Sequence, residues 1–240
     1  MGRQPKKKLK ALFNCVHVFY FVSGRAGALI NLAEEKFKTT SVADLFHLKQ
    51  CINRLLSLAL GRRLSLAQSA FEAAKETCTE ICPEEDAYTE VLFYSELYVE
   101  SVQNISHCIH PYYGGDKANS SQRAQQCVEA ELDKIKQVVD GCGLPDKHGL
   151  MAKAENQVGD AVSVISLWHG IAAGEFKRMA PAPDAQIWAE TYLLPLTYWE
   201  TAAKKTKHRP AAEKIKQEIR ACGQAAVSYT HLTLPTNREV

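Results

Sequence analysis

The chain has 240 residues, and 46% of them are hydrophobic, which is enough material for a large buried core. Its 29 basic and 27 acidic residues give a formal net charge of +2, so any binding of nucleic acid has to depend on local clusters. No stretch approaches the 18 uncharged apolar residues typical of a membrane span. The composition therefore predicts a cytoplasmic protein without a membrane partner.

The N-terminus has basic residues before an apolar run, an arrangement that resembles a secretory signal. However, His17 interrupts the run, and no small-residue cleavage site follows it. We therefore expect no export, and we expect residues 1–10 to form a basic, disordered N-terminus.

Residues 13–22 are rich in β-branched and aromatic types, which predicts a short buried strand. Ser23 can then cap a helix, because apolar residues recur at helical spacing as far as Phe37. A second strand is predicted at about 40–43. Together these elements form a β-α-β unit, and such units carry catalytic groups at the tip of the first strand.

From residue 44 to residue 81 apolar residues recur at three- and four-residue spacing, interrupted only at Gly61. This pattern predicts one long helix or two stacked ones. Pro83 ends this region, and three acidic residues after it suit the first turn of another helix, which extends to Pro111. Glycines predict a loop at 112–121.

Four further helices are predicted at 122–139, 148–179, 184–207 and 210–221. Gly223 is predicted to stop the last of them. Long helices joined by short loops are typical of an antiparallel bundle.

Residues 227–240 are β-prone and resemble the translated read-through of a sequencing adapter rather than a biological tail. We therefore expect the natural chain to be cut off near Ala226. The predicted organisation is a basic N-terminus over 1–10, a β-α-β unit over 11–50, a helical domain over 51–226 and a non-native tail over 227–240.

Eight cysteines are scattered along the chain without a repeated spacing. Cys78 and Cys82 share a helical face, but no second pair of Cys or His residues completes a tetrahedral zinc site. Reduced, mostly buried thiols in a cytosolic protein are therefore expected.

Five local signatures follow one another along the chain: VSGRAGALINLA, ADLFH, LALGRRLS, IHPYY and YLLPLTYWETAAKKTKH. Their order and spacing resemble the middle of DDE-type insertion-sequence transposases, in which a large helical insertion interrupts an RNase H-like core. The likeness covers residues 16–219. It implies a mainly α fold, in which a small β-α-β piece of an RNase H-like core precedes an insertion of long antiparallel helices. The implied parent activity is DNA strand cleavage and transfer.

The resemblance also implies two-metal phosphoryl transfer, with three acidic residues holding Mg²⁺ or Mn²⁺. The second acidic residue is expected at the end of the first strand, in a pattern similar to V-S-D-R-A, where this chain has Gly24. Glycine cannot ligate a metal ion, and the other two acidic residues would lie before Met1 and after Ala226. We therefore expect an inactive internal fragment that binds no metal tightly. DNA is its expected partner. Whether the chain forms a homo-oligomer is left open by the sequence.

The string that begins at Asp44 and ends at His47 resembles the D-x-x-H signature of several transposase groups. This resemblance implies that both residues orient a metal-bound water or contact DNA beside the active site. The structural alternative is that Asp44 caps the following helix and His47 packs in its first turn. The two interpretations are compatible.

Basic residues cluster at the end of a predicted helix and are the first candidates for contacts with DNA phosphates. They are Lys204, Lys205, Lys207, His208 and Arg209. Arg62 and Arg63 form a second candidate pair. The alternative is a solvated helix end, because the helix dipole favours cations at any C-terminus.

His107 and His110 have the spacing of paired metal ligands on a helix, but no matching acidic or cysteine ligand accompanies them. We expect them to have a role at the helix end instead. Trp168, Trp188 and Trp199 fall on apolar helix faces, which favours a place in the bundle core over base stacking.

Two rival functions stay open. The first is a helical interaction scaffold without a nucleic-acid role, which predicts no salt-dependent affinity for DNA. The second is an intact enzyme that uses Asp44, His47 and either Glu34 or Glu35, which predicts metal-dependent nicking that Asp44→Asn abolishes.

Overall fold

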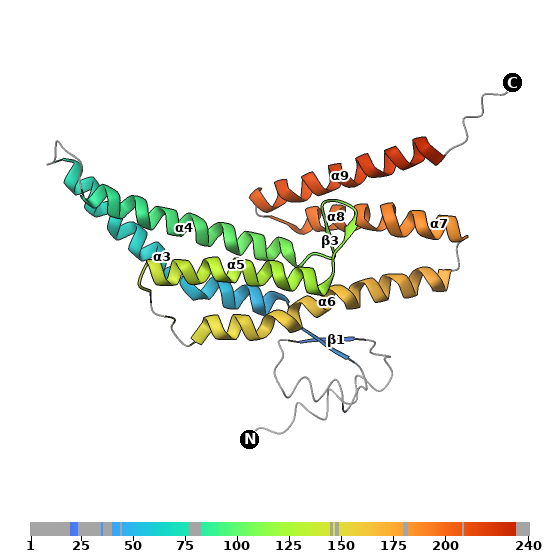
Figure 1. Ribbon diagram of the computed structural model, residues 1–240, viewed down its shortest axis with the longest axis horizontal. Helices are drawn as coiled ribbons and strands as arrows, with labels where there is room; N and C mark the ends of the chain where they lie inside the picture. Colours follow the sequence, from blue (N-terminus) through green and yellow to red (C-terminus); the bar gives the residue numbers. More distant parts are fainter. Residues whose placement is uncertain are drawn as a thin grey trace, which may run out of the picture.

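The computed structural model describes residues 20–23, 35, 40–43, 45–76, 83–144, 146, 149–179, 182–207 and 209–233. Of these residues 88% are helical, which confirms the predicted mainly α class. The described strands form two separate two-stranded sheets. Figure 1 shows that long helices dominate the molecule, with one strand pair beside them.

The first sheet pairs strand β1 (Tyr20–Ser23) with strand β2 (Thr40–Ala43). The strands are parallel and in register, with Ser23 opposite Ala43. Both strands occur where the sequence predicts them, although β1 extends one residue beyond the predicted end. Parallel neighbours require a long crossover connection, as a β-α-β unit has. The helix predicted between them and the basic N-terminus over 1–10 lie outside the described residues.

Four long helices form an antiparallel bundle, as predicted. They are α3 (Leu45–Lys75), α4 (Pro83–Cys108), α5 (Ser121–Gly141) and α6 (Leu150–Met179). Each helix packs against the next, and α6 also packs against α3, so the four close into a ring. Helix α3 continues through Gly61, and the domain boundary predicted after residue 50 falls inside it.

The bundle core consists of apolar residues that recur every three or four positions, the period of an amphipathic helix. Members from α3, α5 and α6 are Leu48, Ile52, Leu56, Leu60, Val128, Leu132, Ile135, Val138, Val158, Val162 and Ile165. Each is at least 98% buried. Burial of one such side chain stabilises the fold by about 1.5–3 kcal/mol, so this face holds the bundle together.

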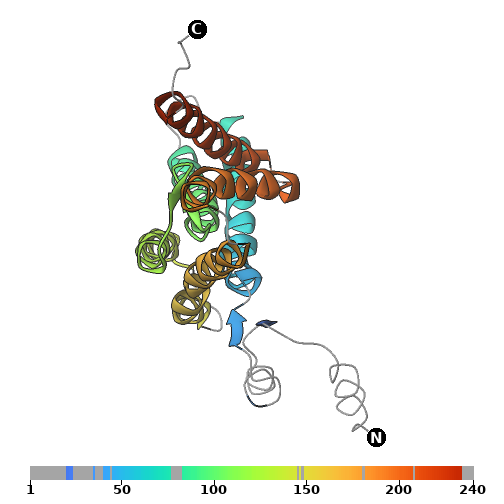
Figure 2. The same cartoon turned by 90° about the vertical axis from the view of Figure 1, so that its right-hand side faces the viewer.

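A second group of helices lies on the opposite side of the bundle from the β1–β2 pair (Figure 2). It comprises α7 (Pro183–Trp188), the π-helical turn η3 (Ala189–Leu193), α8 (Leu194–Lys205) and α9 (Arg209–Thr233). The sequence predicts one helix over 184–207. The wider π turn ends at Leu193, two residues before Pro195, which has no N–H to donate within the helix.

Helix α9 runs to Thr233, so the predictions of a stop at Gly223 and of a β-prone segment from residue 227 are wrong over these residues. One glycine inside a helix costs only about 1 kcal/mol. Ile215 and Cys222 of α9 are buried in a cluster with residues of α8, and this packing outweighs that cost. Residues 234–240 lie outside the described part of the chain.

The segment predicted as a loop at 112–121 contains a small hairpin of β3 (Tyr112–Tyr113) and β4 (Lys117–Ala118). Its turn contains Gly114 at φ 54° and Gly115 at φ 90°. Such positive φ values favour glycine, which is why the two glycines form a tight turn here.

Cys108 at the end of α4 and Cys127 in α5 form a disulfide, with their Cα atoms 6.0 Å apart. The prediction of reduced thiols is therefore wrong for this pair. Cys51, Cys142 and Cys222 are free thiols, as predicted. Antiparallel packing of α4 on α5 brings residues 108 and 127 together, and an irregular cysteine spacing gives no sign of that. Cys15, Cys78 and Cys82 lie outside the described residues.

Candidate nucleic-acid interface

The predicted catalytic positions are only partly covered by the structure. Gly24 and Asp44 lie outside the described residues, directly after the paired strand ends Ser23 and Ala43. His47 lies in the first turn of α3, where the structural alternative places it, and its side chain is not described. The catalytic interpretation of these three positions stays a prediction.

The basic cluster predicted at the helix end lies where α8 meets α9. Lys204 and Lys205 end α8, Lys207 lies in the connecting turn, and Arg209 begins α9. All four side chains are exposed. His208 is outside the described residues. The cluster is therefore available to an anionic partner from solvent.

Arg62 and Arg63 lie on the outer part of α3, and both are exposed. Arg63 donates a hydrogen bond to the carbonyl oxygen of Cys142, the residue that caps α5. Terminal carbonyls of a helix lack partners within the helix, so Arg63 stabilises the end of α5. The structure does not bring this arginine pair to the basic cluster at the α8–α9 turn or to the groove beside that turn.

A groove of about 740 Å³ opens between α4 and the α8–α9 turn, with α3 along one edge. Lys205, Lys207 and Lys214 bring three cationic side chains to it. Most of its lining surface is apolar, and the aliphatic side chains along it are Val99, Val102, Ile109, Ala211 and the largely buried Ile215. None of the described residues that line it is acidic. The groove therefore combines an apolar floor with positive charge.

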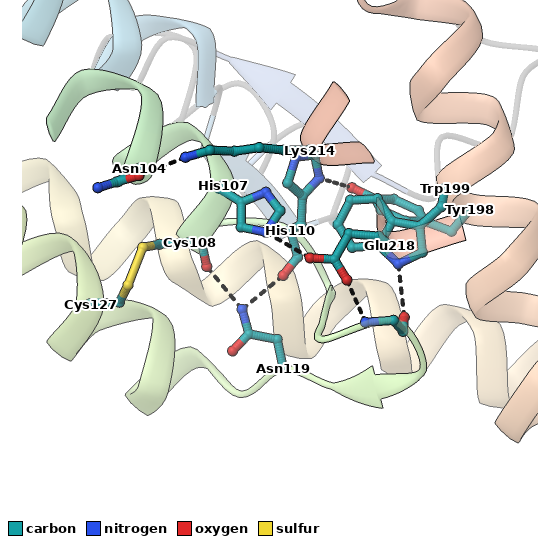
Figure 3. A network of polar contacts seen from close by, with 11 residues as sticks. Asn104, His107, Cys108, His110, Asn119, Cys127, Tyr198, Trp199, Lys214 and Glu218 are labelled. Atoms are coloured by element: carbon teal, nitrogen blue, oxygen red, sulfur yellow. Dashed lines mark hydrogen bonds and ion pairs between the residues drawn. A yellow bond between two sulfur atoms is a disulfide. The ribbon is translucent and has the colours of Figure 1, made fainter. Parts of the chain in front are cut away.

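A carboxylate behind the groove joins three parts of the fold, as Figure 3 shows. The Oε1 atom of Glu218 on α9 accepts a hydrogen bond from His107 Nε2 at 3.0 Å. Its Oε2 atom accepts one from the backbone N–H of Gly115 in the hairpin. The end of α4, the β3–β4 turn and α9 are thereby held together.

Trp199 of α8 lies at the centre of this network. Its side chain is 0% exposed, and its indole N–H donates to the carbonyl of Gly115 at 2.8 Å. The rings of His107 and His110 lie 5.9 Å and 4.8 Å from it, centroid to centroid. The predicted core role is confirmed for Trp199. Trp168 packs partly buried against the same cluster, and Trp188 is half-buried.

The end of α4 is fixed by hydrogen bonds from Asn119 to its backbone and between Tyr198 and the ring of His110. Asn119 donates from its side-chain amide to the carbonyl oxygens of Cys108 and His110, at 2.9 and 2.8 Å. His110 Nδ1 forms a hydrogen bond with the hydroxyl of Tyr198. Burial raises the pKa of Tyr198, so this hydroxyl stays protonated. The expected helix-end role of the two histidines is the one observed.

Lys214 is held in place from the α4 side. Its Nζ donates to Asn104 Oδ1 at 2.9 Å, and the amide of Asn104 donates to Glu131 at 3.3 Å. Lys134 also forms an ion pair with Glu131 at 2.8 Å. The ammonium group of Lys214 is therefore positioned before any ligand arrives.

The described residues do not supply the metal site that the resemblance implies. No three His, Cys, Asp or Glu side chains within them are grouped so as to hold a metal ion. Gly24, at the position of an expected ligand, has no side-chain donor. No chemical step can be assigned to a divalent ion from these residues.

Ionisation of Glu218 depends on its neighbours. Burial acts to raise the pKa of this carboxyl group, but the hydrogen bonds from His107 and the Gly115 N–H outweigh burial and lower it. A carboxyl group whose pKa is lower in the folded state than in the unfolded state stabilises the fold fully at pH values above its unfolded pKa. That stability is lost as pH falls through the folded pKa.

We therefore expect Glu218→Gln to lower the free energy of unfolding at pH 7 by about 1.5–3 kcal/mol, the cost of losing hydrogen bonds to a charged group. The difference between variant and wild type should shrink in acid, below the usual carboxyl pKa of 4.5. Urea unfolding at several pH values measures this difference. Glu200→Gln, at an exposed position of α8, is the control and should change stability little at any pH. A pH-independent cost of Glu218→Gln would contradict the assignment.

Comparison of the chain with known protein families, curated proteins and solved structures finds no match. Within the described residues, no helix has both the length and the apolar character that a membrane crossing needs.

Proposed function

We propose that the chain is an internal fragment of a DDE-type insertion-sequence transposase, which retains affinity for DNA but is catalytically inactive. The sequence signatures suggest the family, and the arrangement of described elements supports it. A parallel strand pair precedes a bundle of long helices, the order that an RNase H-like core with a helical insertion requires. A cytoplasmic location, where DNA is accessible, belongs to the same proposal.

The observation that carries DNA binding is the cluster of basic side chains at the α8–α9 turn. Four of them are exposed within a few residues of one another, and Lys214 adds a fifth cation on the first turns of α9. Lysines that replace counterions on DNA phosphates provide affinity that falls as salt rises. Such contacts require charge and access, and the turn provides both.

Inactivity follows from the residues at the expected metal positions. A two-metal mechanism requires several carboxylates around the ions, and Gly24 stands where one of them is expected. We expect no Mg²⁺-dependent nicking of supercoiled DNA above that of a blank. Nicking that disappears in Asp44→Asn would contradict this proposal and support an intact enzyme.

Fluorescence anisotropy with a labelled DNA duplex at low salt tests the binding. The triple variant Lys204→Ala, Lys205→Ala and Lys207→Ala should bind at least about tenfold more weakly than the wild type. The control removes the same charge elsewhere, at the exposed residues Lys75, Lys153 and Lys177. It should keep most of the affinity.

Two results would contradict the proposal. Equal losses in the two triple variants would mean that binding is a non-specific effect of net charge. No measurable binding by the wild type would favour a helical scaffold without a nucleic-acid role.

A further inference from the structure

We infer that the groove between α4 and the α8–α9 turn binds an unpaired nucleic-acid strand in preference to a duplex. This inference rests on the proposed function and deepens it, because it assigns a site and a strand type to the DNA affinity. Four properties of the groove support it: its positive charge, its apolar floor, its polar side chains and its size.

Positive charge reaches the groove from two elements. Lys205 and Lys207 are exposed at the α8–α9 turn, and Lys214 projects from α9 with its ammonium group fixed by Asn104. The described lining contains no carboxylate, and Glu218 behind it is engaged by His107 and Gly115. A phosphodiester strand can therefore lie along the groove without meeting an exposed acidic group there.

The floor of the groove is an apolar surface that can contact the faces of unpaired bases but not those of a duplex. Val99 is 49% exposed, and the partly buried Val102 and Ile109 continue the apolar surface. In a duplex the flat faces of the bases are stacked inside, whereas an unpaired strand presents them to apolar and aromatic side chains. The rings of His107 and His110 also line the groove, so an unpaired strand would bury surface that a duplex leaves wet.

Polar side chains along the groove favour bases over an acidic peptide. The side-chain amides of Asn53 and Gln103 are among the lining groups. The apolar face of an amphipathic peptide helix would cover these groups without hydrogen-bond partners, at a cost in affinity. Base edges carry donors and acceptors that can pair with them.

The size of the groove also favours an unpaired strand over a duplex. A volume of about 740 Å³ falls in the range of about 300–1,000 Å³ that holds small ligands, so a short unpaired segment fits. A B-form duplex, whose major groove alone is about 12 Å wide, can only rest on the rim.

Fluorescence anisotropy with the full chain tests the inference, using a labelled oligothymidylate of about 15 nucleotides and a duplex of equal length. We expect the single strand to bind about tenfold or more tightly than the duplex. Val99→Asp, which places a negative charge on the floor, should weaken single-strand binding about tenfold and change duplex binding less than about twofold. Leu66→Asp is the matched control, because Leu66 is 72% exposed on α3 outside the groove. It should change neither affinity.

The outcomes separate this inference from the proposed function. If Val99→Asp and Leu66→Asp behave alike, or if the duplex binds as tightly as the single strand, the groove is not the site. DNA affinity that still depends on Lys204, Lys205 and Lys207 would then leave the proposed function standing. Absence of binding to either DNA would overturn both. Displacement of the oligothymidylate by polyglutamate at lower concentrations than by unlabelled oligothymidylate would assign the groove to an acidic peptide and overturn the inference.

Discussion

Gly115→Ala is expected to lower the free energy of unfolding by about 3 kcal/mol or more. Gly115 has φ 90°, a conformation that an alanine adopts only with strain. An added Cβ would also lie 2.7 Å from the Cβ of Ala221 and 3.0 Å from the backbone N of Cys222. Because backbone atoms of α9 cannot move aside alone, the hairpin or the helix would have to shift.

Gly114→Ala is the matched control for this substitution. Gly114 also has a positive φ, at 54°, but an added Cβ would meet only Lys117 Cδ at 3.8 Å. Its cost should be limited to backbone strain, about 1–2 kcal/mol. Urea unfolding of both variants compares the two costs. Equal destabilisation would mean that α9 does not pack against the hairpin as described.

Trp199→Ala is the second large effect, with an expected loss of about 3–5 kcal/mol. The substitution empties a fully buried site and leaves the carbonyl of Gly115 without its indole donor. It also removes the ring that His107 and His110 pack against. We expect lower stability together with a lower affinity of the groove for nucleic acid, because both histidines line the groove.

Two variants separate packing from hydrogen bonding in that effect. Trp199→Phe retains much of the apolar volume but loses the N–H donor, so its cost should be smaller, about 1–3 kcal/mol. Trp188→Ala, at a half-buried position of α7, should cost less than Trp199→Ala. Thermal unfolding followed by circular dichroism measures all three. A cost at Trp188 equal to that at Trp199 would contradict the assignment of Trp199 as the centre of the cluster.

Much of the fold could be predicted because its helices carry long apolar stripes. Leu48, Ile52, Leu56 and Leu60 repeat every four residues, and all of them are buried in the bundle core. The parallel strand pair was also indicated by composition alone. Local pattern is sufficient where burial on one face determines the structure.

The incorrect predictions occur where tertiary packing outweighs local preference. Gly223 would end an isolated helix, but α9 passes through it because Ile215 and Cys222 are buried against α8. Pro195, which lacks an N–H, lies inside a continuous helical path that widens into a π turn over Ala189–Leu193. Neither feature can be recognised from neighbours in the sequence.

The candidate site was predicted in part. Lys205 and Lys207 were identified from their clustering, and the structure adds Lys214, a cation of the same groove. Lys214 and Glu218 are four residues apart, so a shared helix face was foreseeable. Their partners, Asn104 and Gly115, are more than 100 residues away in sequence, so only the fold reveals the network.

The most direct test of the DNA-binding account is the salt dependence of duplex affinity for the wild-type chain. We expect the logarithm of the association constant to fall linearly with the logarithm of salt concentration, as counterions are released. In the Lys204, Lys205 and Lys207 triple variant the slope should be shallower by about one for each lysine that contacts a phosphate. An affinity that does not change with salt, or an unchanged slope in that variant, would contradict the account.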